Sequence, residues 1–180
     1  MLALLLALAA LAPPPVAAPP AQVARATEPA AAVPRPAITR RFIPLTAQRR
    51  ADTAAYARRH YGSATTTVQP HAIVEHWTQT GSVDATRDIF VPNVPDAELG
   101  ERPGTCAQFV IARSGRIVQL APITFLCRHT VGLNWAAIGI EHVGVSDAQV
   151  LANRAQMRSS LALTAWLMSR YRIPLANVIG

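Results

Sequence analysis

The sequence contains no lysine, and all 17 of its basic side chains are arginines. With 10 acidic residues, the formal net charge is +7 at pH 7. The arginines are scattered, and only Arg40-Arg41, Arg49-Arg50 and Arg58-Arg59 are adjacent. Nucleic-acid-binding proteins normally concentrate such residues in one patch or stripe. We therefore interpret the arginines as a solvated surface and predict no nucleic-acid partner, although the net charge would also suit the anionic bacterial envelope.

The sequence also lacks an apolar run long enough to span a bilayer, which requires about 20 residues. Residues 1–12 are a shorter run of leucine and alanine after the first methionine, with a length typical of a signal-peptide h-region. Small residues at 16–18 and 23–26 offer cleavage sites. We therefore predict a signal peptide over residues 1–26 and export to the periplasm or the medium. No cysteine lies nearby to carry a lipid, so no stable membrane anchor is expected.

The remaining sequence predicts one domain behind a linker. Residues 27–38 are rich in alanine and proline, which favours a segment without regular structure. Residues 39–180 mix helix and strand patterns, so we predict a monomeric α/β domain with a central mixed sheet flanked by helices. Helices are expected at 46–60 and 146–171, and strands at 73–77, 106–112, 116–121, 136–143 and 178–179. Residues 84–104 contain three prolines and are predicted to form a surface loop that lines a groove.

Only two cysteines are present, Cys106 and Cys127. They lie at the outer ends of the predicted hairpin, where antiparallel pairing would bring them close enough for a disulfide. An exported protein would keep such a bridge oxidised. Two buried thiols are the alternative. The pair lacks the C-x-x-C spacing of metal ligands, which argues against a metal site.

A histidine and a glutamate, two residue types that often take part in catalysis, lie within apolar segments that predict strands. His76 ends one predicted strand, and Glu141 lies near the end of another. Alternation along the second strand places Glu141 and Gly139 on one face and Ile138 and Ile140 on the other, so the carboxylate can point into a cleft. A lone histidine in such a place is more often a hydrogen-bonded core residue, and the glutamate can equally form a structural ion pair. The residue types alone leave both alternatives open.

Short motifs follow one another from Ile73 to the end of the sequence. They are the strand-end His76, Phe109-Val110-Ile111 with Gly115 to Leu120, His129 to Gly132, Ile138-Gly139-Ile140-Glu141, and Val178-Ile179-Gly180. This order resembles the type 2 N-acetylmuramoyl-L-alanine amidases, which share their fold with the peptidoglycan recognition proteins. The resemblance implies a zinc-dependent hydrolase that cleaves the amide bond between N-acetylmuramic acid and L-alanine in peptidoglycan.

The resemblance also implies a role for individual residues. His76 would bind zinc, and Glu141 would take a proton from the attacking water and return it to the leaving amine. His129 and Asn134 would contact the muramyl-peptide. In that family the other zinc ligands follow the Val-Ile-Gly motif, where this sequence ends at Gly180. We therefore expect a C-terminally incomplete domain with little or no activity as the 180-residue chain. The alternatives are a module that binds muramyl-peptide without cutting it, and an exported α/β domain of unrelated function.

Overall fold

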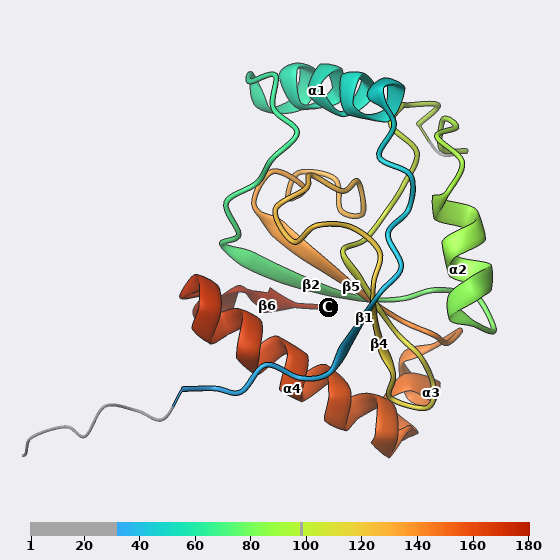
Figure 1. Cartoon of the computed structure of the whole chain (residues 1–180), viewed down its shortest axis with the longest axis vertical. Helices are drawn as coiled ribbons and strands as arrows, with labels where there is room; N and C mark the ends of the chain where they lie inside the picture. The colour runs from blue at the N-terminus through green and yellow to red at the C-terminus, as the bar shows by residue number, and fades with distance from the viewer. Residues whose placement is uncertain (1–31, 98) are drawn as a thin grey trace, which may run out of the picture. The chain divides into compact units, whose positions relative to one another are not determined.

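The computed structural model describes residues 32–97 and 99–180 (Figure 1). The predicted signal peptide lies outside these residues. The strands are β1 (Ile38–Arg40), β2 (Ala72–Trp77), β3 (Phe109–Ile111), β4 (Ile117–Gln119), β5 (Ala137–His142) and β6 (Val178–Ile179). The helices are α1 (Ala47–Tyr61), α2 (Val83–Phe90), α3 (Asp147–Ala152) and α4 (Arg154–Tyr171), with a 3-10 turn at Leu175–Asn177.

The strands form one mixed sheet in the order β1-β4-β3-β5-β2-β6. All neighbouring pairs are parallel except β3 and β4, which are the two strands of the predicted hairpin. Figure 1 shows α4 along one side of the sheet and α1 on the other side. The mixed sheet with flanking helices that the sequence predicts is therefore confirmed. Among the described residues, no helix is both long and apolar enough to cross a membrane.

The alternation within β5 decides which side chains face α4. Ile138 and Ile140 pack with Leu163 and Leu167 of α4 in one apolar cluster, in which all four are 0% exposed. A fully buried aliphatic side chain contributes about 1.5–3 kcal/mol, so this contact fixes the register of β5 against the helix. Glu141 must then project to the opposite face of the sheet, as the sequence pattern predicts.

Two segments differ from the expectation. The predicted loop at 84–104 begins with the helix α2, whose buried Val83, Thr86 and Phe90 follow a helical spacing and whose N-cap is Ser82. The predicted long helix is divided at Asn153, whose side-chain oxygen accepts hydrogen bonds from the backbone N–H of Ala155 and Gln156 and so starts α4 anew. Strand β1 was not predicted, because three residues are too few for a visible alternation.

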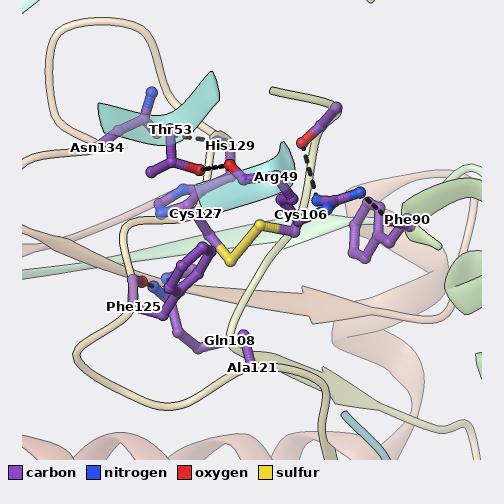
Figure 2. The surroundings of a disulfide bond; sticks show 12 residues. Arg49, Thr53, Phe90, Cys106, Gln108, Ala121, Phe125, Cys127, His129 and Asn134 are labelled. Carbon is purple, nitrogen blue, oxygen red and sulfur yellow. Dashed lines mark hydrogen bonds between the residues drawn. A yellow bond between two sulfur atoms is a disulfide. The ribbon is translucent and has the colours of Figure 1, made fainter. Parts of the chain in front are cut away.

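A disulfide joins Cys106, before β3, to Cys127 (Figure 2). Their Cα atoms are 5.1 Å apart, and both residues are buried. Of the two alternatives left by the sequence, the structure shows the bridge. It ties the end of the segment 91–105 to the residues that lead into His129.

Removing this bridge should destabilise the domain. The two cysteines are 21 residues apart in sequence, and closing a loop of this size is worth about 3 kcal/mol through the entropy of the unfolded chain. The double variant Cys106→Ala/Cys127→Ala should therefore lose about 3 kcal/mol of unfolding free energy in a urea titration. An unchanged midpoint would mean that the bridge does not form in solution.

Candidate functional site

The sheet places the two main candidate residues side by side. His76 of β2 pairs with Glu141 of β5, and Glu141 pairs with Val110 of β3. Paired residues of neighbouring strands project to the same face, here the face opposite α4. Two residues that are 65 positions apart in the sequence are therefore neighbours on one face of the sheet. The buried Val110 lies on the other side of Glu141 in the same row.

Glu141 has the electrostatic properties of a proton-transfer group. Among the described residues, its Oε2 atom is buried and has no hydrogen-bond partner. Burial disfavours the ionised form and raises the pKa of Glu141 to about 7. The side chain lines a cavity of about 130 Å³ between the end of β2 and α2. A carboxyl group with a pKa near neutrality can both accept and donate a proton at pH 7.

His129 reaches the same row from the segment that follows Cys127 (Figure 2). Its ring lies against the backbone of Gly139, and a Cβ atom at that position would come within 2.8 Å of ring carbons. Because Gly139 precedes Glu141 on the same face, this contact places His129 beside the His76–Glu141 row. Only a glycine leaves room for the ring there.

The imidazole rings of His76 and His129 lie close to each other and to the hydroxyl group of Thr130. Nε2 of His76 lies 3.2 Å from Nδ1 of His129, and Oγ1 of Thr130 lies 3.2 Å and 3.0 Å from these two nitrogens. Burial lowers the pKa of both imidazoles, and that of His129 falls to about 3 with a further contribution from the nearby His76. Both rings are therefore neutral at pH 7, and each has one nitrogen lone pair available.

Asn134 lies behind this group and is 0% exposed. Its Oδ1 atom accepts hydrogen bonds from the backbone N–H of His129 at 2.8 Å and of Thr130 at 2.7 Å. Its Nδ2 atom donates to the hydroxyl of Tyr56 at 3.0 Å. These contacts give Asn134 a structural role in holding the turn at 129–134, while its contact with substrate stays a prediction.

A cavity of about 300 Å³ adjoins His129 and forms the groove that the sequence predicts beside residues 84–104. Its lining includes Asp96, Leu99, Thr105 and Arg128. The buried Arg128 donates hydrogen bonds to the carbonyls of Glu101 and Pro103 and forms an ion pair with Asp96. The wall of the groove is thus held by one arginine that directly precedes His129, which couples the position of the wall to that of the histidine.

The sequence profile of a family described as N-acetylmuramoyl-L-alanine amidase matches residues 66–180, more than half of the chain. The chain belongs to this family. No curated protein sequence matches it significantly.

Solved structures with a similar fold include amidases and a recognition protein. The endolysin N-acetylmuramoyl-L-alanine amidase LysCS from Clostridium intestinale has a TM-score of 0.56 at 20% identity, over 82% of each chain. PlyL has a TM-score of 0.53 at 16% identity, over 79% of each chain. The peptidoglycan recognition protein SA of Drosophila has a TM-score of 0.50 at 18% identity, over 80% of this chain and 79% of its own. At such identities, these likenesses show the fold.

The part of the chain that the structure describes does not contain a full set of ligands for the zinc ion of this amidase family. A catalytic zinc normally has three protein ligands from histidine, cysteine or carboxylate side chains. Residues 32–97 and 99–180 contain no group of three or more such side chains placed to hold a metal ion. The described residues therefore do not complete a site of the usual kind around His76.

One residue on the α4 face of the sheet, Glu75, was not predicted from the sequence. On the α4 face, His142 donates from Nδ1 to the backbone carbonyl of His76 at 2.9 Å, and its Nε2 lies 3.5 Å from the Glu75 carboxylate. Burial raises the pKa of Glu75, although Thr164 donates a hydrogen bond to it at 2.7 Å. Glu75 could have been found by the argument used for Glu141, because it is also a carboxylate in an apolar strand.

The close contact of Gly139 predicts a stability effect. Gly139→Ala should lower the unfolding free energy by about 1–3 kcal/mol, because the added methyl group would overlap the His129 ring. Gly81→Ala is the matched control, since a Cβ atom there meets nothing within 4 Å. Urea unfolding of the two variants checks this expectation. Equal stabilities would show that the ring of His129 does not rest on β5.

Proposed function

We propose that this domain hydrolyses the amide bond between N-acetylmuramic acid and L-alanine in peptidoglycan. Membership of the amidase family supports the reaction type. The observation that carries the proposal is the Glu141 carboxyl group, which lies beside His76 and whose pKa is raised by burial to about 7. A structural carboxylate would be expected to have a hydrogen-bonded or charged partner for both oxygens, whereas Oε2 of Glu141 has none among the described residues.

Glu141 would act twice in this reaction. Its ionised form takes a proton from the water that attacks the amide carbonyl carbon. The C–N bond then breaks, and the protonated carboxyl group returns the proton to the leaving amine of L-alanine. Because the attacking step requires the carboxylate, the rate should rise as the pH increases through about 7. The cavity lined by Arg128 and His129 is the proposed site for the muramyl-peptide.

Zinc dependence, with His76 as a ligand, is the part of this proposal that rests on family membership alone. The purified chain should be incubated with muropeptides in the presence of zinc or of a chelator, and the products identified by mass spectrometry. The proposal expects free stem peptides with a new L-alanine amino terminus and an intact sugar, released slowly because the described residues do not complete a zinc site. Cleavage within the glycan or within the peptide would reject it. Equal rates with zinc and with chelator would reject the zinc dependence only.

A second candidate function is recognition of peptidoglycan without cleavage. It is favoured by the absence, from the described residues, of three convergent metal-ligating side chains. The chain should then sediment with purified cell walls while releasing no soluble peptide. A chain that neither sediments with cell walls nor releases peptide would contradict both candidate functions.

We also propose that the protein is exported and acts as a monomer in the periplasm or outside the cell. The support is the leucine- and alanine-rich run at residues 1–12, followed by small residues. Expression in a bacterial host should give a mature protein whose amino terminus lies between residues 17 and 27. Mass spectrometry of the fractionated protein measures this directly, and an unprocessed chain confined to the cytoplasm would contradict export.

A further inference from the structure

A second cavity, of about 470 Å³, lies on the α4 side of the sheet, the side opposite Glu141. Small-molecule sites are typically concave, mostly apolar and about 300–1,000 Å³ in volume, with a few polar groups that converge on the ligand. The apolar residues that line this cavity come from several elements and include Trp77, Val150, Met157, Leu161 and Leu175. This α4-side cavity therefore has the size and the apolar lining of a small-molecule site.

His142 supplies an unsatisfied polar atom to the α4-side cavity. The residue lines the cavity and is 4% exposed. Its Nδ1 atom donates a hydrogen bond to the backbone carbonyl of His76 at 2.9 Å. Because a carbonyl oxygen can only accept, Nδ1 carries the proton of the neutral ring, and Nε2 has a free lone pair. Among the described residues, Nε2 is buried without a hydrogen-bond partner, so it requires a donor from elsewhere.

Glu75 places a second acceptor next to this nitrogen. Its Oε2 atom lies 3.5 Å from Nε2 of His142. The hydroxyl of Thr164 donates to Oε1 at 2.7 Å, and the hydroxyl of Ser160 lies 3.4 Å from Oε2, so α4 holds the carboxylate in place. At a separation of 3.5 Å, one N–H donor group can lie about 2.9 Å from both acceptors. The cavity therefore offers a preformed pair of acceptors to a ligand that carries several protons on one nitrogen.

The charges that line the α4-side cavity favour a cation. Glu75 and the exposed Asp147 both line it, whereas none of the described residues that line it is an arginine, although the net charge of the chain is +7. A primary ammonium group has three donors and no acceptor, which matches the two acceptors, and a hydrogen bond between charged groups is stronger than one between neutral groups. A carboxylate ligand would be repelled, and a neutral alcohol has only one donor.

We propose that the α4-side cavity binds a primary organic ammonium ion with an apolar body. The ammonium group would donate to Nε2 of His142 and Oε2 of Glu75, and the apolar body would lie against Trp77 and Leu161. The site uses neither Glu141 nor the groove proposed for the muramyl-peptide. It therefore does not depend on the proposed hydrolysis, and its test requires no peptidoglycan.

Titration of the full chain with hexylamine, followed by NMR, tests the proposal. Hexylamine is an ammonium ion at pH 7, as a lysine side chain is. Its addition should shift the backbone amide signals of residues 75–77 and 157–164. Hexanol has the same apolar body without the charge, and methylamine has the charge without the apolar body, so each should bind at least about tenfold more weakly. Hexanoate should bind more weakly than hexanol.

Three variants separate the two halves of the site. Glu75→Gln should weaken hexylamine binding by at least about tenfold and leave hexanol binding unchanged, because glutamine keeps the shape but loses the charge. Leu161→Ala changes a side chain that is 66% exposed, and it should weaken the binding of both probes. Asp88→Asn is the matched control, since Asp88 is an exposed carboxylate of α2 away from this cavity, and it should bind both probes as the wild type does.

The results that would overturn the proposal are equally specific. Hexanol binding as tightly as hexylamine would show that the cavity does not recognise a cation. Hexylamine shifts confined to residues outside the cavity, or no binding at all, would reject the site. Circular dichroism establishes that each variant is folded. Should Glu75→Gln fail to fold, the ratio of the hexylamine and hexanol affinities of the wild type, together with Leu161→Ala, still decides the question.

Discussion

Glu141→Gln should lower kcat for muropeptide hydrolysis by about 100- to 10,000-fold while leaving KM nearly unchanged. Glutamine keeps the shape of the side chain and its place between Val110 and His76 in the sheet, but it cannot take a proton from the attacking water. The loss should therefore appear in the chemical step and not in substrate binding. Single-turnover rates together with a binding measurement on the same muropeptide separate the two.

The same substitution should make the folded protein more stable at pH 8. The pKa of Glu141 is raised from 4.5 to about 7 in the folded state, so folding disfavours its ionised form. This destabilisation is absent below about pH 4.5, grows as the pH rises towards 7, and is fully present above it. Glutamine removes it, so thermal unfolding at pH 8 should occur at a higher temperature in Glu141→Gln, with no gain at pH 4.

If Glu141→Gln has both a lower kcat and a higher stability at pH 8, unfolding of the variant cannot explain its lower activity. An inactive variant that is also less stable at pH 8 would indicate that Glu141 is a structural residue. A variant with wild-type kcat would remove the glutamate from the mechanism. Asp88→Asn is a suitable control, since Asp88 is an exposed carboxylate of α2 that does not border the candidate site. It should leave both the rate and the pH dependence of stability unchanged.

The sequence predicts the central sheet well because buried strands leave a strong pattern. In β5, the alternation of isoleucines with Gly139 and Glu141 indicates both the strand and the direction of the carboxylate, as the packing of Ile138 and Ile140 against α4 confirms. Helix α2 was missed because its eight residues lie next to a proline-rich segment, and the prolines favoured a loop. Short elements of this kind depend on tertiary contacts that a local pattern does not contain.

The main residues of the candidate site could also be predicted, but the residues that surround and position them could not. The motif order identifies His76, His129 and Glu141, and the structure brings them together. The contact of Thr130 with both imidazoles depends on a turn that Asn134 closes from five and four residues away. No spacing in the sequence distinguishes such a threonine from an exposed one. Likewise, the Glu75–His142 contact joins two strands whose order in the sheet is known only once the domain is folded.

Arg49 shows most clearly where sequence reasoning reaches its limit. As one of two adjacent arginines it was interpreted as a surface residue, yet it is 1% exposed. Its guanidinium group donates hydrogen bonds to the carbonyls of Phe90 at 2.7 Å, Pro92 at 2.9 Å and Gly104 at 3.2 Å (Figure 2 shows the bond to Phe90). One side chain of α1 therefore satisfies the backbone at both ends of the segment 91–104, which includes the wall of the groove.

Arg49→Met should lower the unfolding free energy by about 4 kcal/mol. Hydrogen bonds to a charged group contribute about 1.5–3 kcal/mol each, and the gain from no longer burying the guanidinium offsets part of the loss of three of them. Methionine fills a similar volume, so the loss of stability would come from the three carbonyl groups left without hydrogen bonds and not from a cavity. Limited proteolysis should cut the variant first within 91–104. Arg58→Met, on an exposed position of the same helix, should change the stability by less than about 0.5 kcal/mol. Equal stabilities of the two variants in urea would show that Arg49 does not hold this segment.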